Sequence, residues 1–222
     1  MFRYNIIYSR RRSISISVSP DKGVTVRAPL RASLNSIESF VNSRSEWVLK
    51  HLNNYSSHIR LNGPVADGGK VLFRGKEYLL RLVNGDKVDV LISDNEIIVL
   101  SPVEKNPLAA EKALKKWYYD QAAILIPDKI GMMILKYQSF GFNPSMITIR
   151  RMKRRWGSCS SKGRITINSE LVKIDDRFTD YVILHELCHL KQHNHGPEYY
   201  NLLSQVCPEW KNVRKELRKY LS

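Results

Sequence analysis

The chain has few cysteines and no long apolar run, and these two absences exclude several classes of protein. Three cysteines, an odd number, stand among 222 residues, which does not fit the paired cysteines of a disulfide-rich secreted domain. No apolar run approaches the roughly 20 residues that a membrane-spanning helix needs. The first four residues also lack the apolar core of a signal peptide. We therefore expect a cytoplasmic protein with no membrane partner.

Acidic residues are scarce relative to basic ones: 21 stand against 36, for a net charge of +15. The segment 129–169 contains no acidic residue at all. Its basic residues are concentrated at Arg150, Arg151, Lys153, Arg154, Arg155, Lys162 and Arg164. Scattered positive charge keeps a protein in solution, but such a concentration favours an anionic ligand. Nucleic acid is the weakest candidate partner, because no helix-turn-helix, zinc-finger or aromatic RNA-binding signature is found.

Histidines cluster strongly, since four of the six fall between positions 185 and 195. The apolar residues around His185-Glu186-Leu187-Cys188-His189 predict a buried helix over residues 176–193. At about 100° per residue, His185 and His189 lie one turn apart on the same helix face, where both can bind one metal ion. Metal binding would also satisfy polar side chains that are costly to bury. We assign Cys188 to core packing.

His195 is the predicted third ligand, because it follows His185 by ten positions, as in zincins with an HExxHxxGxxH motif. Gln192 stands where that motif has a glycine, so we expect the chain to reverse at Asn194 or Gly196. His193 is then expected to face solvent, and Glu198 is a weaker alternative ligand. Zinc is the expected metal, with iron, nickel and copper as alternatives that imidazole also binds.

Glu186 lies on the flank of the histidine pair, and we predict that it is the catalytic general base. Tyr199 or Tyr200, just beyond His195, is a candidate donor for a tetrahedral oxyanion, or else a packing residue. Arg151, Arg154 and Arg155 are the predicted substrate-binding cations. The broken alternation after Ile149 suggests a β-bulge near Arg150 or Arg151 that would turn an arginine towards the site. Trp156 is expected in the core.

Three segments together resemble a known family: residues 150–159, residues 180–196 and residues 207–210. They resemble the YgjP-like metal-dependent hydrolases, which are related to SprT-like metallopeptidases. The resemblance implies a zincin core, a zinc-type site made by His185, His189 and His195, and a catalytic Glu186. It also implies that the strand at 164–168 lies at a sheet edge and holds an extended substrate.

The pattern of elements predicts an α+β fold, with an antiparallel β-rich subdomain over residues 1–102 and a zincin-like helical and β catalytic domain over residues 103–222. The first contains a hairpin over 14–26, a helix over 33–53 with Ser33 as N-cap, and an antiparallel meander over 70–100. The second contains strands near 146–153 and 164–168 and, besides the metal-binding helix, helices over 107–123, 127–140, 197–206 and 208–221.

These residues favour a metal-dependent hydrolase of the metallopeptidase kind, acting on a peptide. An anionic small molecule is the alternative substrate, because the basic cluster would suit a pyrophosphatase acting on nucleoside triphosphates. A nucleic-acid-associated protease is the third hypothesis, on charge alone.

Overall fold

The computed structural model describes residues 2–19, 23–56, 59–61, 63–102 and 106–221. The chain begins with a three-stranded sheet of β1 (Tyr4–Ser9), β2 (Ser15–Ser19) and β3 (Gly23–Pro29), with β3 in the centre. β2 and β3 are antiparallel, which confirms the hairpin, although its turn at residues 20–22 lies outside the described residues. β1 runs parallel to β3, so this sheet is mixed.

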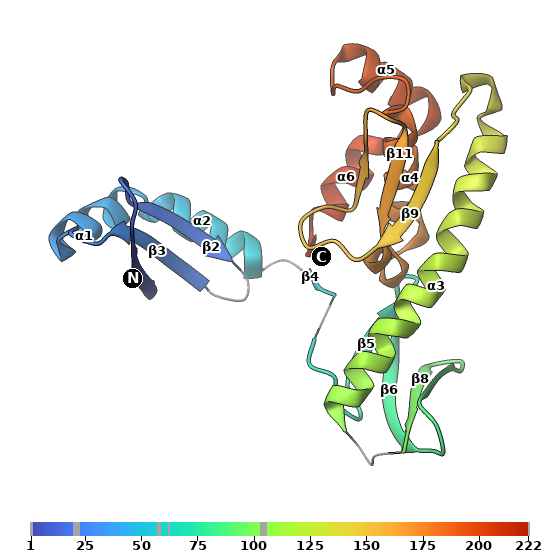
Figure 1. The fold of residues 1–222 in the computed structure, drawn as a ribbon, viewed down its shortest axis with the longest axis horizontal. Helices are drawn as coiled ribbons and strands as arrows, with labels where there is room; N and C mark the ends of the chain where they lie inside the picture. Colours follow the sequence, from blue (N-terminus) through green and yellow to red (C-terminus); the bar gives the residue numbers. More distant parts are fainter. Residues whose placement is uncertain (1, 20–22, 57–58, 62, 103–105, 222) are drawn as a thin grey trace. The chain divides into compact units, whose positions relative to one another are not determined.

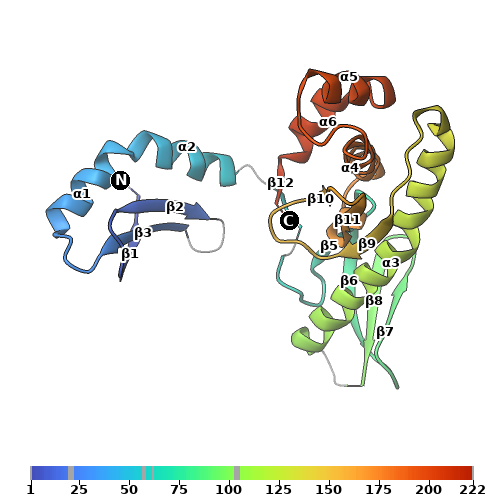
Figure 2. The same cartoon turned by 45° about the horizontal axis from the view of Figure 1, so that its top comes forward.

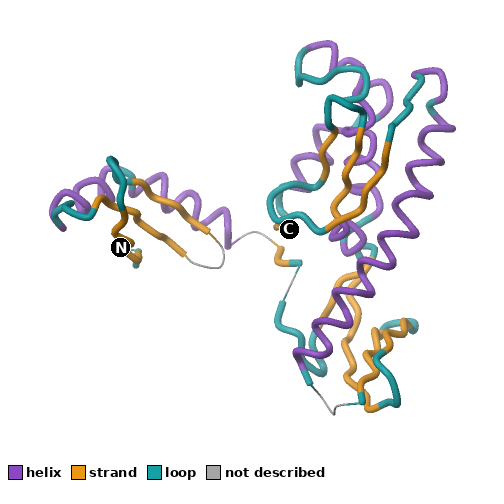
Figure 3. The backbone as a smooth tube through the Cα atoms, viewed as in Figure 1, coloured by secondary structure: helices purple, strands orange, loops and turns teal. Residues whose placement is uncertain are grey.

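Two helices follow this sheet, α1 (Leu34–Ser43) and α2 (Ser45–Ser56) (Figure 3). Ser33 is the N-cap, as predicted, and its Oγ accepts a hydrogen bond of 3.2 Å from the Ser36 amide. The single helix expected over 33–53 is interrupted at Arg44, whose backbone leaves the helical region at φ −113° and ψ 9°. Apolar periodicity could not show this break, because it continues on both sides of Arg44.

A second sheet has the order β5-β6-β8-β7, made of β5 (Lys70–Phe73), β6 (Lys76–Asn84), β7 (Asp89–Ile92) and β8 (Glu96–Ser101). β6 and β8 are parallel neighbours, so the antiparallel meander is wrong at this step. Burial explains why β6 and β8 are neighbours. Leu80 of β6 and Ile97 of β8 are fully buried at the centre of the sheet, whereas Leu91 and Ile92 of β7 are exposed at its edge.

The longest element is α3 (Pro107–Lys136), which runs past both sheets of the C-terminal part (Figure 1). Two helices were expected here, divided near Pro127, but Pro127 lies inside one continuous helix. Ala122, Ile126 and Ile130 are fully buried around it. Their packing outweighs the roughly 3 kcal/mol that an internal proline costs a helix.

After η1 (Gln138–Phe140), a third sheet has the order β10-β11-β9, made of β9 (Met146–Arg150), β10 (Gly157–Cys159) and β11 (Arg164–Asn168). The central place of β11 corrects the expectation that residues 164–168 form an edge strand. β9 ends at Arg150, so the broken alternation marks the end of the strand instead of a bulge. Trp156, half-buried in the following loop, packs against the core.

The remaining elements are η2 (Ser169–Lys173), α4 (Asp176–Cys188), α5 (Pro197–Val206), α6 (Trp210–Leu217) and two short strands, β4 (Ile59–Arg60) and β12 (Tyr220–Leu221) (Figure 2). The predicted bounds of α5 are confirmed, whereas α6 is shorter than the expected 208–221. In the part of the chain that the structure describes, no helix is long and apolar enough to cross a membrane.

Packing divides the chain into two units, residues 1–59 and residues 60–222. The first has its own small core, which includes Val26, Ile37 and Val41. The division falls earlier than the boundary that we expected at residue 102, because the β5–β8 sheet shares one hydrophobic core with α3 and α4. The predicted α+β class is confirmed.

Candidate metal centre

The histidine pair lies near the C-terminal end of α4, a helix whose N-cap, Asp175, accepts a hydrogen bond of 3.0 Å from the Arg177 amide. Apolar residues bury most of α4, and α5, α6, β10 and β11 all contact it. Cys188 is fully buried in this packing, and burial raises the pKa of its thiol to about 12. A thiol with such a pKa stays protonated at neutral pH, as expected of a packing residue.

α4 ends at Cys188, five residues earlier than predicted, and the chain then turns back at once. The amides of Lys191 and Gln192 donate hydrogen bonds to the Cys188 carbonyl at 3.1 and 3.0 Å. This turn needs no left-handed residue: among the described residues, Arg74 alone combines a side chain with a positive φ, and Gly196 has a φ of −86°. The left-handed reversal expected at Asn194 or Gly196 is therefore wrong.

The turn brings the three predicted histidine ligands together. The Nε2 atom of His195 lies 3.1 Å from the Nε2 of His189 and 3.2 Å from the Nε2 of His185. In a tetrahedral zinc site with Zn–N bonds of about 2.05 Å, two ligand nitrogens lie about 3.3 Å apart. Two of the three distances match this spacing, and all three ligand nitrogens lie within 4.8 Å of one another, so the three histidines could hold one metal ion. His193 and Glu198, the alternatives, are exposed and stand outside this group.

Two of the rings are oriented by hydrogen bonds to their other nitrogen. The Nδ1 of His189 donates to the Gln192 carbonyl at 3.0 Å. The Nδ1 of His185 lies 2.7 Å from the Tyr199 hydroxyl, which itself donates to the His185 carbonyl at 3.1 Å. A hydroxyl that donates elsewhere accepts from Nδ1, so both rings carry their proton on Nδ1 and keep Nε2 free for a metal.

Tyr199 is fully buried beneath the three histidines. Its ring stacks on His189 with centroids 4.6 Å apart and meets His195 edge-on at 4.7 Å. Because its hydroxyl is used by His185, Tyr199 is not placed as the substrate contact that we expected. Sequence reasoning missed this role, since the contact depends on a turn whose geometry the sequence did not predict.

Electrostatics favour neutral imidazoles at this site. Burial, together with the neighbouring histidines, lowers the pKa of His185 to about 3. Burial also lowers the pKa values of His189 and His195 from their ordinary range. Neutral imidazoles keep the Nε2 lone pairs that bind metals.

Glu186 is buried against the backbone of β10. A Cβ atom placed on Gly157 would lie 2.5 Å from Glu186 Oε1, so only glycine fits beside this carboxyl group. Burial raises the pKa of Glu186 to about 8, while the nearby charge of Arg155 opposes that shift. Gly157 therefore has a close-packing role, which the sequence reasoning missed.

The loop between β9 and β10 is held by Asn168, which is fully buried. Its side-chain amide donates to the carbonyls of Met152 at 2.9 Å and Arg155 at 3.0 Å, and its Oδ1 accepts from the Met152 amide at 3.2 Å. Its backbone amide donates to the Trp156 carbonyl at 2.8 Å. Asn168 thus fixes the conformation of the loop that leads to Gly157. The only sign of this role in the sequence is that a side-chain amide, Asn168, stands at the end of an apolar strand.

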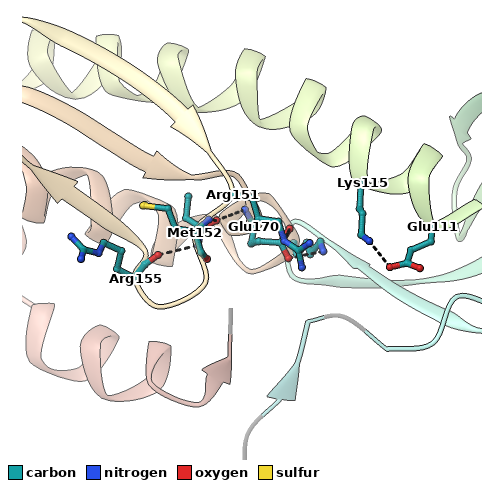
Figure 4. Close-up of polar contacts among 8 residues, drawn as sticks. Glu111, Lys115, Arg151, Met152, Arg155 and Glu170 are labelled. Atoms are coloured by element: carbon teal, nitrogen blue, oxygen red, sulfur yellow. Dashed lines mark hydrogen bonds and ion pairs between the residues drawn. The ribbon is translucent and has the colours of Figure 1, made fainter. Parts of the chain in front are cut away.

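The three predicted substrate-binding arginines do not act together. Arg155 lies close enough to Glu186 to affect its pKa. Arg151 instead forms an ion pair with Glu170, with Nε and Oε1 3.4 Å apart, and its side chain points away from that of Arg155 (Figure 4). Arg154 is exposed, like the rest of the basic cluster.

Comparisons with known proteins identify the family of the chain. The chain is similar to the crystal structure of the metallopeptidase zymogen of Methanocaldococcus jannaschii jannalysin, with 29% identity and a TM-score of 0.36 over 41% of this chain and 92% of that one. It is also similar to that of Pyrococcus abyssi abylysin, with 21% identity and a TM-score of 0.37 over 42% of this chain and 91% of that one. A search of curated proteins found no match. The model of the YgjP-like metallopeptidase domain matches residues 12–220, so the chain belongs to the YgjP-like metallopeptidase family.

Proposed function

We propose that this metallopeptidase is a zinc-dependent enzyme in which His185, His189 and His195 hold the metal and Glu186 is the general base. The observation that carries the proposal is the convergence of three histidine nitrogens within 4.8 Å of one another, with the Nε2 of His195 at 3.1 and 3.2 Å from the other two, close to the spacing of a tetrahedral site. Family membership supports a divalent metal and a peptide substrate.

A divalent metal bound there would supply Lewis acidity, making water a stronger acid and polarising the scissile carbonyl. Glu186 takes a proton from the attacking water and returns it to the amine that leaves. Burial suits Glu186 to this exchange, because a carboxyl group with a raised pKa can hold a proton near neutral pH. The positive charge of Arg155 opposes this rise in pKa and so favours the ionised carboxylate, which is the form that accepts a proton.

Tyr199 and Gln192 position the ligands. Each accepts a hydrogen bond from a histidine Nδ1, which leaves the opposite nitrogen directed at the metal. Asn168 positions the loop that brings Gly157 against Glu186. The substrate would add to the sheet along β10, an edge strand in the sheet order and the one beside Glu186.

A pyrophosphatase is less consistent with this arrangement. Hydrolysis of a triphosphate calls for several cations converging on one oxygen-rich group. Among the three predicted arginines, the charge of Arg155 alone affects the pKa of Glu186, while Arg151 forms an ion pair with Glu170. This separation favours a peptide over a polyphosphate.

Hydrolysis of a quenched fluorescent peptide library by the zinc-loaded protein tests the proposal. We expect Glu186→Gln to lower kcat by more than about 100-fold, the usual contribution of a general base, with zinc content unchanged. The matched control is Glu198→Gln, an exposed glutamate outside the histidine group, which should keep full activity. Peptide hydrolysis that survives Glu186→Gln would reject the role of Glu186.

A further inference from the structure

A cavity of about 170 Å³ lies in the C-terminal unit, between α3, β5, η2 and Arg151, and the three histidines take no part in it. A space of about 10–15 Å³ on this scale already holds one water molecule. The cavity therefore has room for a small organic molecule. Neither the metal centre nor the proposed peptide site uses it.

Positive charge dominates the side chains that line this cavity. Four of them are cationic and Glu111 alone is anionic among the described lining residues; the cations are Lys70, Lys115, Arg151 and Lys173. Lys115 comes from α3 and Arg151 from the loop after β9; both line the cavity and both side chains are half-exposed (Figure 4).

Three carboxylates pair with these cations and are already engaged. Glu77 is paired with Lys70, with Oε1 and Nζ 2.5 Å apart. Glu170 is buried and divides its oxygens between Arg151 at 3.4 Å and Lys173 at 2.9 Å. Glu111 is paired with Lys115, whose hydrogen bond and charge lower the pKa of that carboxyl group. None of the three carboxylates therefore calls for a cationic ligand, and among the described residues the four cations of the cavity stand against three paired carboxylates.

Lys173 forms a fixed part of the cavity wall, because its ammonium lies 4.3 Å from the centroid of the Tyr118 ring. The Tyr118 hydroxyl donates in turn to the Leu72 carbonyl at 2.7 Å. Burial lowers the pKa of Lys173; the charge and the hydrogen bond of Glu170 oppose that shift, and the charges of Arg151 and Lys115 lower the pKa further. An anion placed among these three cations would add to the compensation that Glu170 already provides.

The remaining wall is apolar and includes Leu61, Val65, Leu72 and Leu114. A ligand that contacts both the cationic side chains and the apolar wall has one negatively charged end and a short hydrocarbon body. We propose that this cavity is a second binding site, distinct from the metal centre, for a small organic anion bearing one carboxylate or phosphate group. Lys115 and Arg151 hold the charged end, and the apolar wall holds the body.

Isothermal titration calorimetry of the full chain, at constant ionic strength, tests this site with benzoate and phenyl phosphate as probes. We expect one of them to bind saturably at one site per chain. Lys115→Gln should weaken it by about tenfold, the value of one charge-assisted hydrogen bond. Arg151→Gln should do the same. The matched control, Lys116→Gln, alters a lysine of the same helix that pairs with Asp120 outside the cavity and should change nothing.

His189→Ala separates this site from the metal centre and should leave probe binding unchanged. The proposal is overturned if neither probe binds saturably. It is equally overturned if binding is lost in His189→Ala but kept in Lys115→Gln and Arg151→Gln, because the anion would then occupy the histidine cluster.

Discussion

At position 157 any side chain would collide with Glu186, because a Cβ atom there would lie within 2.9 Å of three atoms of that side chain. The backbone of β10 thus forms one wall of the proposed catalytic site at its closest approach. Gly157 does not have a positive φ, so its backbone conformation does not require glycine. Glycine is required here because a side chain has no room beside Glu186.

Gly157→Ala is therefore expected to displace Glu186 while leaving the three histidines in place. We predict a loss of kcat of at least about tenfold, since misplacement by 1 Å can cost about 100-fold, with zinc stoichiometry unchanged. Gly131→Ala is the matched control, because no atom lies within 4 Å of a Cβ added there. Equal kcat values for the wild type and Gly157→Ala would show that Glu186 does not act from this position.

The candidate site residues that are close together in the sequence were easier to predict than those brought together by the fold. Their spacing alone predicts that His185, Glu186 and His189 lie within about one turn of the same helix, without knowledge of the fold. His195 needed only a chain reversal, although the left-handed turn that we predicted at Asn194 or Gly196 was wrong. Tyr199 could not be assigned, because its contact with His185 depends on how α5 packs against α4.

At the scale of elements, the start of α4 is held by ion pairs from two other parts of the fold. Asp176, in its first turn, accepts a hydrogen bond from Arg74 and lies 3.6 Å from the ammonium of Lys129. Burial raises the pKa of Asp176, but Arg74 and Lys129 together lower it below its usual range. A carboxylate at a helix N-terminus is also favoured by the helix dipole.

Asp176→Asn tests this anchoring as a function of pH. A carboxyl group whose folded pKa is lowered stabilises the protein above its unfolded pKa of about 3.9, and that stability is lost as the pH falls through the folded value. We predict a loss of about 1 kcal/mol at pH 7, allowing for screening of a partly exposed pair. Chemical denaturation should show the two proteins converging below about pH 4. A difference that grows on acidification would contradict this assignment.

Element boundaries were least predictable where tertiary packing decided them. Pro127 normally ends a helix, yet the buried residues on either side keep α3 continuous. The parallel pairing of β6 with β8 likewise follows from two strongly buried strands meeting in the sheet centre. Alternating apolar residues indicated strands but carried no information on their order.

At the scale of the whole molecule, the chain has two separate hydrophobic cores. The core of residues 60–222 includes α4 and both larger sheets, whereas the core of residues 1–59 is small and, among the described residues, is built from Val26, Ala28, Ile37 and Val41. A unit of the larger size buries enough surface to fold alone.

The fragment 60–222 is therefore predicted to fold cooperatively and to bind one zinc ion with the affinity of the full chain. Thermal unfolding followed by circular dichroism, together with a zinc titration, checks both properties. A fragment that aggregates or unfolds without a cooperative transition would show that residues 1–59 are needed for its core.

The central claim, that three imidazoles bind one metal ion, is tested most directly by competitive zinc titration of five proteins. The wild type should bind one zinc ion per chain, and His185→Ala, His189→Ala and His195→Ala should each weaken binding by at least about 100-fold, since each removes one of three protein ligands. His193→Ala, at the exposed histidine of the same turn, should bind like the wild type. Wild-type affinity in any one of the three ligand variants would contradict the three-histidine site.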